Sequence, residues 1–307
     1  MARSSPQQAA KATIPIGSGR APAHGAVAPE AAYGYPRDFL NNKYVYLVIS
    51  PRAGGLSIGV NVNPVLQCTF DCVYCEINRG LPSRAPRFDV EKMAGELRGT
   101  FTLATGGGLR QLPRYAHLPE DLLQVRHVSI SGDGEPTLSN FFTDALEAII
   151  HLRVIGALPF FKVVVITNSS ALDRPEVQRG LKLLTREDEI WAKLDAGTQE
   201  YMDRVNRASV PLDKIMGNIL TLGRQRPVVI QSLFPAINGE PPPAREIKQY
   251  AGRLKELKDA GAEIPLVQIY SATRPMARTG STHLPLKSLS EIARTVRRVA
   301  GLRAEVY

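Results

Sequence analysis

The stretch Lys162-Val-Val-Val-Ile-Thr167 is an almost unbroken run of β-branched residues. A short apolar run of this kind is typical of a β-strand rather than of a helix. Helical spacing of apolar residues precedes it over 141–154, and a second helical segment follows over 175–184, where proline occupies the first turn. The strand is therefore expected to lie between two helices.

The same alternation extends outward in both directions. Further strands are expected at 56–62, 127–131, 190–194, 228–234 and 266–270. Further helices are expected at 90–103 (with Asp89 as N-cap), 199–205, 244–260 and 289–299. Such alternation implies right-handed βαβ units and a parallel sheet. Either a partial TIM-like barrel or an open doubly wound sheet fits, and both place chemistry at the carboxyl ends of the strands.

Composition divides the chain into an expected tail, core and extension. The 307 residues are 44% hydrophobic and 22% charged, as in ordinary globular proteins. The first segment is rich in Ala, Pro, Gly and Ser and has no apolar signal core, so a disordered tail is predicted at 1–40. A core is predicted at 41–285 and a C-terminal helical extension at 286–307. No run of 18 uncharged apolar residues occurs, so we expect no membrane contact and a cytoplasmic location.

The net charge of +9 favours anionic partners. The first 38 residues contribute +2, so +7 belongs to the remainder. A basic surface favours nucleic acid, nucleotides or phosphorylated metabolites, and an anionic substrate with tRNA as one candidate is kept as a partner, although many soluble proteins of this charge bind no nucleic acid. Six arginines follow the expected cysteine loop or later strands and are candidates to bind phosphate: Arg79, Arg84, Arg87, Arg204, Arg207 and Arg274.

All three cysteines lie in one segment, Cys68-Thr-Phe-Asp-Cys72-Val-Tyr-Cys75, directly after the first expected strand. The odd count argues against a disulfide framework. Thiolates select zinc, copper(I) or iron–sulfur clusters. A structural zinc ion would need a fourth ligand, and His117 is 42 residues beyond Cys75. Three thiolates on a four-iron cluster would leave one iron open to a substrate or cofactor, whereas a zinc loop completed by a distant His or Asp stays an alternative.

The CxxxCxxC spacing, with the aromatic Tyr74 before the third cysteine, resembles the signature of the radical S-adenosylmethionine (radical SAM) superfamily. The resemblance implies a partial (β/α)6 TIM-like barrel. It implies that Cys68, Cys72 and Cys75 hold a [4Fe-4S] cluster whose open iron chelates S-adenosylmethionine. Reductive cleavage would then yield a 5′-deoxyadenosyl radical that abstracts hydrogen from a substrate. An external one-electron donor of the flavodoxin or ferredoxin type is implied as a partner.

A second match lies at the end of the second expected strand, in Ser131-Gly-Asp-Gly-Glu-Pro-Thr137. It resembles the Gly-Gly-Glu-Pro motif of the same superfamily, whose backbone meets the amino group of S-adenosylmethionine. Here the sequence is Gly132, Asp133, Gly134 and Glu135, so the first two motif positions are not a glycine pair. The glycines would allow close backbone approach and Glu135 would place a carboxylate near a cation. A simple glycine turn before a helix is the alternative.

Polar residues end the later strands as well. The superfamily resemblance implies contacts to S-adenosylmethionine from Asn168, Lys193 and Asp195, and packing of Tyr74 near the adenine. Weaker candidates of the same kind are Gln231, Ser232, Gln268 and Tyr270. Each could instead be a turn or cap residue.

Softer motifs resemble one subgroup, the iron–sulfur oxidoreductases related to wyosine tRNA synthases. They are Trp-Ala-Lys-Leu-Asp-Ala from Trp191, Val-Asn-Arg from Val205 and Ser-Ala-Thr-Arg-Pro from Ser271. Wyosine synthases bind a second cluster through additional cysteines, and this chain has none to spare, so wyosine synthesis itself is not expected. Two other functions stay open: an activase of a glycyl-radical enzyme, and an RNA-binding iron–sulfur or zinc protein without radical catalysis.

Overall fold

The computed structural model describes residues 39–78, 87–274 and 276–307. Nearly all of the expected tail, together with Arg79 and Arg84, lies outside these residues. The main sheet has eight strands in the order β1-β2-β3-β4-β5-β6-β8-β10. The strands are β1 (Val45–Ser50), β2 (Gly55–Asn61), β3 (Val125–Ser131), β4 (Lys162–Thr167), β5 (Glu189–Lys193), β6 (Val229–Leu233), β8 (Val267–Tyr270) and β10 (Ala304–Val306). Two short strands, β7 (Ala236–Ile237) and β9 (Ser281–Thr282), pair separately.

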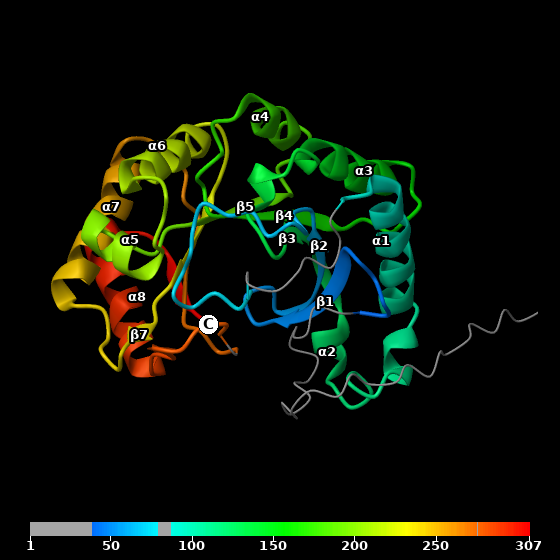
Figure 1. Ribbon diagram of the computed structural model, residues 1–307, viewed down its shortest axis with the longest axis horizontal. Helices are drawn as coiled ribbons and strands as arrows, with labels where there is room; N and C mark the ends of the chain where they lie inside the picture. Colours follow the sequence, from blue (N-terminus) through cyan, green and yellow to red (C-terminus); the bar gives the residue numbers. More distant parts are fainter. Residues whose placement is uncertain (1–38, 79–86, 275) are drawn as a thin grey trace, which may run out of the picture.

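The helices lie around the outside of the curled sheet (Figure 1). They are α1 (Val90–Thr105), α2 (Glu120–Leu123), α3 (Phe142–Val154), α4 (Pro175–Leu181), α5 (Gln199–Val205), α6 (Leu212–Gly223), α7 (Ala244–Asp259) and α8 (Leu286–Ala300). Outward-facing residues of β2, such as Leu56, Ile58 and Val60, are completely buried in the core beneath them. Alternate residues face the interior of the curl, where Ser57 of β2 meets Ser129 of β3.

The predicted α/β partial barrel is confirmed. Each of the six predicted strands is present and pairs in parallel with the next, from β2 through β3, β4, β5 and β6 to β8. The curl of the sheet excludes the open doubly wound alternative. The sequence interpretation missed the edge strands: β1 pairs antiparallel with β2, and β10 pairs parallel with β8.

The segment after residue 286 was expected to be a helical extension. It contains α8, which packs against α7, and then β10, which joins the main sheet. The predicted helix at 289–299 is part of α8, whereas α6 was absent from the sequence interpretation and buries Leu212, Ile215, Ile219 and Leu222 at helical spacing. No helix in the described part of the chain combines the length and apolar character needed to cross a membrane.

The glycine-rich segment between α1 and β3 is folded onto the core. It contains a 3-10 turn at Gly108–Gln111 and the short helix α2. Leu109 and Tyr115 are buried, and the Arg110 guanidinium donates to the Ala116 carbonyl at 3.2 Å and to Glu120 at 2.8 Å. These contacts close the segment into a compact unit beside the sheet.

Candidate functional site

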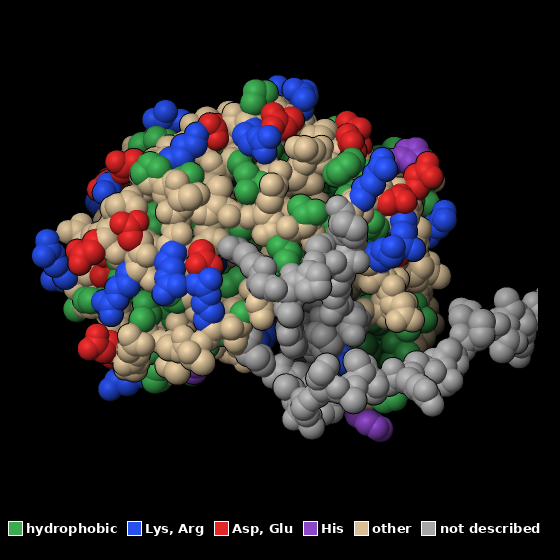
Figure 2. Space-filling model, viewed as in Figure 1, with side chains coloured by type: hydrophobic (Ala, Val, Ile, Leu, Met, Phe, Trp, Pro, Cys, Tyr) green, Lys and Arg blue, Asp and Glu red, His purple; other side chains and the backbone are tan. Residues whose placement is uncertain are grey.

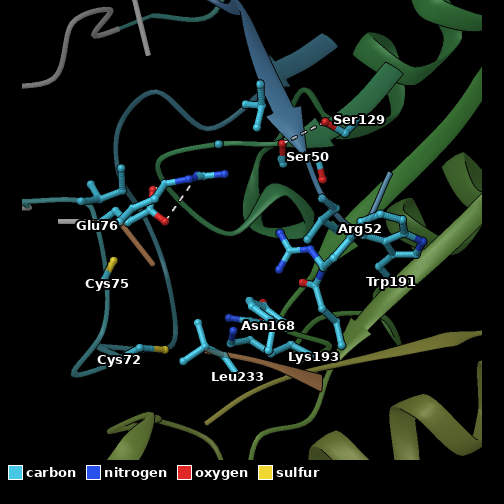
Figure 3. Close-up of a pocket in the computed structure, with 18 of the residues that line it drawn as sticks. Ser50, Arg52, Cys72, Cys75, Glu76, Ser129, Asn168, Trp191, Lys193 and Leu233 are labelled. Atoms are coloured by element: carbon cyan, nitrogen blue, oxygen red, sulfur yellow. Dashed lines mark hydrogen bonds and ion pairs between the residues drawn. The ribbon is translucent and has the colours of Figure 1, made fainter. Parts of the chain in front are cut away.

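A cavity of about 340 Å³ occupies the interior of the partial barrel. Its wall includes all three cysteines, the segment from Gly132 to Glu135, and residues from the inner faces of β1 to β6 and β8. Figure 3 shows Cys72 and Cys75 on one side of the cavity and Trp191 on the other. The carboxyl ends of the strands thus surround the cysteine loop, as parallel α/β architecture predicts.

The cysteine loop is fixed to the segment that follows β5. Backbone bonds join the amides of Asp71 and Val73 to the carbonyls of Asn206 and Val205, at 2.8 and 3.0 Å, and the amide of Ser209 to the carbonyl of Thr69 at 2.8 Å. On the other side the amide of Ala277 donates to the Cys75 carbonyl at 2.8 Å. Long-range contacts on both sides therefore determine where the thiols lie.

Two side-chain amides donate hydrogen bonds to cysteine sulfurs. Asn206 Nδ2 lies 3.4 Å from Cys72 Sγ, and Asn168 Nδ2 lies 3.5 Å from Cys68 Sγ. The predicted site residue Asn168 therefore contacts the cysteine loop. Burial raises the pKa of the unliganded Cys72 thiol to about 11, an effect that exceeds the opposing effect of Lys193. Metal binding would therefore have to displace the thiol proton.

The predicted residues Tyr74, Lys193 and Asp195 form one buried network. Asp195 Oδ2 accepts from the Tyr74 hydroxyl and from Asn206 Nδ2 at 2.7 Å, and it lies 3.4 Å from Lys193 Nζ. Burial, followed by the charge of Asp195, raises the pKa of Tyr74, so the phenol stays protonated. For Lys193, burial favours the neutral form, but Asp195 opposes it and the net pKa is raised. Lys193 is thus a cation held beside the cysteine loop.

The two glycines after β3 are packed against the end of β2 and the loop that follows it. Gly132 has φ +146°, and a Cβ there would lie 2.3 Å from Asn61 Oδ1. A Cβ on Gly134 would lie 2.4 Å from the Gln67 carbonyl oxygen and 2.7 Å from Asn63 Cγ. Approach of this backbone to S-adenosylmethionine stays a prediction, and the close neighbours of both glycines in the structure are protein groups. Asp133 accepts from Asn61 Nδ2 at 2.7 Å.

The Glu135 carboxylate links the ends of β3 and β4. Oε1 accepts from the Thr137 amide and from the hydroxyls of Thr137 and Thr167, and Oε2 accepts from the Asn168 amide at 2.7 Å. Burial raises the pKa of this carboxyl, while these donors oppose the shift. A contact between Glu135 and a cationic ligand group stays a prediction, and the hydrogen bonds give the side chain a structural role in addition.

Sequence interpretation did not identify Asn206, Asn61 or Asn63 as parts of the site. Asn206 lies within the quoted Val-Asn-Arg motif, so a signal was present in that motif although its role was not assigned. Asn63 donates to the carbonyls of Gln67 and Glu135, at 2.9 and 2.8 Å. No local pattern marks such an asparagine, because one of its two partners, Glu135, lies 72 residues later in the chain.

The donor set fits an iron–sulfur cluster. Among residues 39–78, 87–274 and 276–307, no three His, Cys, Asp or Glu side chains are gathered closely enough to hold a single metal ion. A zinc ion would require each sulfur within about 2.3 Å of one point. A four-iron cluster separates its sulfur ligands further. Three thiols that open onto one cavity, two of them receiving N–H···S bonds, suit such a cluster.

The proposed phosphate-binding arginines are only partly free. Arg274 pairs with Glu76 at 3.2 Å and Arg204 with Glu240 at 3.6 Å, whereas Arg87 and Arg207 are exposed. On the face seen in Figure 2, Lys and Arg side chains are interspersed with acidic ones around the edge of the molecule. Binding of tRNA therefore stays a prediction.

No protein-family model matches the chain. Among curated proteins it is similar to a UPF0026 protein of Synechocystis, with 29% identity over 184 residues, 59% of this chain and 60% of that protein. It is also similar to a UPF0026 protein of Helicobacter pylori, with 28% identity over 232 residues, 74% of this chain and 67% of that protein. The matched region thus covers about three fifths of the length of the Synechocystis relative.

Several solved structures share the fold, including three that overlap most of this chain. They are a radical SAM methyltransferase from Sphaerobacter thermophilus (TM-score 0.59, 13% identity, 86% of this chain and 68% of that one), SuiB of Streptococcus suis bound to S-adenosylmethionine (0.57, 15%, 83% and 52%), and TYW1 with a lysine–pyruvate adduct (0.54, 15%, 83% and 84%). The chain therefore has the partial-barrel fold found in radical SAM enzymes.

Proposed function

We propose that this protein is a radical SAM enzyme that cleaves S-adenosylmethionine reductively. The observation that carries the proposal is the shared cavity: the three cysteines and the segment from Gly132 to Glu135 open onto one space inside a barrel of this fold. Neither a structural zinc loop nor inert core cysteines would require a cavity beside the thiols.

Cys68, Cys72 and Cys75 would hold the cluster. When bound, the cluster supplies the electron that breaks a carbon–sulfur bond of S-adenosylmethionine. The chain's own contribution is positioning, since Asn206 and Asn168 aim N–H donors at two of the sulfurs. Hydrogen bonds to cluster sulfurs make reduction easier because they stabilise added negative charge.

S-adenosylmethionine would lie where the ends of β3, β4 and β5 meet the cysteine loop. Asn168 and Lys193 line the cavity there, and Lys193 Nζ lies 4.8 Å from the centre of the Tyr74 ring. A partly exposed ammonium group held by Asp195 can bind a carboxylate without large reorganisation. We propose that Lys193 serves the methionyl carboxylate and that Asp195, which has no exposed side-chain surface, positions Lys193 and Tyr74.

The finer assignments are proposals as well. We propose that the electron arrives from an external donor of the flavodoxin or ferredoxin type and that the substrate is anionic, with tRNA as one candidate. We propose a relation to the iron–sulfur oxidoreductases related to wyosine synthases. Two residues of the motifs shared with that subgroup lie at the site and support it: Trp191 lines the cavity, and Asn206 donates to Cys72.

Anaerobic reconstitution tests the proposal. The expected product contains about four iron and four sulfide per chain. Reduction with dithionite in the presence of S-adenosylmethionine should yield 5′-deoxyadenosine. Cys72→Ala is the inactive variant, and Lys255→Gln is the matched control because Lys255 pairs with Asp259 on the exposed face of α7. One zinc per chain with no 5′-deoxyadenosine would contradict the proposal.

A further inference from the structure

Arg52 lines the same cavity as the cysteines, but the proposed cleavage of S-adenosylmethionine assigns it no role. It lies in the turn between β1 and β2. Figure 3 shows its side chain reaching into the cavity beside Trp191, with the cysteines across from it. An arginine directed inward from a turn needs an explanation, because a turn residue can usually extend into solvent.

The turn that carries Arg52 is held rigidly. The amides of Ala53 and Gly54 donate to the Ser50 carbonyl at 3.1 and 3.0 Å. Arg126, on β3, donates through Nε to the Gly54 carbonyl at 2.9 Å. The backbone of the turn is thereby fixed both internally and to the neighbouring strand, so Arg52 is presented to the cavity in a defined position.

The guanidinium group of Arg52 stacks on a tyrosine ring and forms no ion pair within residues 39–78, 87–274 and 276–307. Its Cζ lies 4.0 Å from the centre of the Tyr270 ring, at the end of β8. Stacking uses the flat face of the guanidinium and leaves the N–H groups along its edge available to an anion. Arg52 Nε is buried, and it has no hydrogen-bond partner among the residues that the structure describes. A buried donor in this condition favours a ligand that accepts its hydrogen bond.

The acidic side chains lining the cavity are engaged elsewhere. Glu76 pairs with Arg274, Asp133 accepts from Asn61, and Glu135 accepts from threonine and Asn168 donors. Lys193, the other cation of this wall, is paired with Asp195. Among the described residues, Arg52 is thus the lining cation that forms no ion pair with an acidic side chain.

A row of hydroxyl groups runs along the wall of the same cavity. Ser57 Oγ lies 3.1 Å from Ser129 Oγ, which lies 3.4 Å from Ser131 Oγ, and the Tyr46 hydroxyl lies 2.8 Å from Ser131 Oγ. Hydroxyls can rotate to donate or accept, so this wall can bind oxygen atoms of a polar ligand.

We propose that Arg52 binds a carboxylate or phosphate group of a small substrate inside the barrel. This inference rests on the proposed function, since it names the class of molecule that would meet the radical. Because Arg52 faces the barrel interior, its position favours a small anionic molecule over the continuous phosphate backbone of RNA. Tyr270 orients the guanidinium, and the serine wall holds the remaining polar atoms.

The test uses the full-length reconstituted protein with S-adenosylmethionine present. The probes are succinate, inorganic phosphate and uncharged succinamide, and binding is followed by the emission of Trp191, the single tryptophan of the chain. Arg52→Gln removes the charge, and Arg52→Lys keeps the charge but loses the planar fork. Lys255→Gln, which removes a charge from the exposed Lys255–Asp259 pair, is the control.

Succinate, phosphate or both should bind wild type and Lys255→Gln equally. The dissociation constant should rise about 10- to 100-fold in Arg52→Gln, as expected for loss of hydrogen bonds to a charged group. It should rise less in Arg52→Lys, and succinamide should not bind. Binding of one anion alone identifies the substrate group as carboxylate or phosphate, and the tighter of two binding anions identifies the preferred group.

Equal anion binding by wild type and Arg52→Gln would overturn the inference, as would binding of neither anion by wild type. Arg52-dependent binding of tRNA without binding of either small anion would overturn the small-molecule assignment. Measuring 5′-deoxyadenosine in the same samples separates the two proposals. If wild type forms 5′-deoxyadenosine while replacement of Arg52 has no effect on anion binding, the inference fails and the proposed function stands. If anion binding depends on Arg52 but no 5′-deoxyadenosine forms, the anion site stands and the proposed function fails.

Discussion

Gly134→Ala should destabilise the protein and prevent cluster assembly, although the φ of Gly134 lies outside the left-handed region. The added Cβ would lie 2.4 Å from the Gln67 carbonyl oxygen, which belongs to the backbone next to Cys68. That oxygen accepts from the Glu135 amide at 2.7 Å and from Asn63 Nδ2 at 2.9 Å. A larger side chain at position 134 therefore cannot be accommodated unless the start of the cysteine loop moves.

The size of the effect follows from these contacts. Overpacking a rigid site costs about 1–3 kcal/mol. Displacing Gln67 also weakens two hydrogen bonds to its carbonyl, each contributing about 0.5–1.5 kcal/mol. The free energy of unfolding should fall by about 2–6 kcal/mol in total. Gly252→Ala is the matched control, because a Cβ at this position in α7 meets nothing within 4 Å and should stabilise the helix by about 0.5–1 kcal/mol.

Urea unfolding of the two variants and the iron content after reconstitution are the measurements. Gly134→Ala should be less stable than wild type and retain little iron, and Gly252→Ala should match or exceed wild type in both. If Gly134→Ala kept its stability and its iron and lost only S-adenosylmethionine binding, the glycine would serve the cofactor directly and the packing argument would be refuted.

Three further predictions concern the cysteines and two buried carboxylates. Replacing any one of the three cysteines by alanine should abolish iron retention and 5′-deoxyadenosine formation. A single variant that keeps a full cluster would refute the ligand set of Cys68, Cys72 and Cys75. Asp195→Asn should lower the free energy of unfolding by about 1–3 kcal/mol, because it removes the buried carboxylate that pairs with Lys193, whose side chain is only partly exposed. Asp259→Asn, at an exposed pair, should change it by less than about 1 kcal/mol in the same urea titration. For Asp188, burial acts to raise the pKa but the paired Arg153 and backbone donors outweigh it, so the folded pKa is lowered. The ionised carboxylate therefore stabilises the fold above the unfolded pKa of about 3.9, and this contribution disappears as pH falls through the folded pKa. Asp188→Asn should reduce the loss of stability between pH 7 and pH 3, and an unchanged pH dependence would count against this pair.

The parallel core of the fold could be predicted from local sequence because its elements carry strong periodic signals. β4 and α5 have the bounds that their sequences indicate, at Lys162–Thr167 and Gln199–Val205. α6 carried a comparable signal, with apolar residues at helical spacing after Pro211, and was overlooked. β10 could not be predicted, because three residues carry no period and this strand exists through its pairing with β8.

Parts of the site could be predicted from sequence only where their residues form a recognisable motif. The cysteine spacing and the glycines after β3 identified two walls of the cavity. The positions of Asn206 and Arg52 depend on tertiary packing: Asn206 donates to a sulfur 134 residues earlier in the chain, and Arg52 reaches Tyr270 from the turn between two strands. Sequence spacing contains no information about such distances, so local sequence does not reveal the roles of these two residues.

The hydrogen bond between Asn206 and Cys72 also has a consequence for when the chain can retain iron during its synthesis. A ribosome that has just completed Cys75 has made all three thiols, but the amide that donates to Cys72 will be added 131 residues later. Contacts of such long sequence separation form late, since a large loop must close first. We therefore expect iron to be retained only by chains extended beyond residue 209, the last residue that fastens the cysteine loop to the segment after β5. Iron retention by nascent chains stalled before Asn206 would show that the loop is self-sufficient.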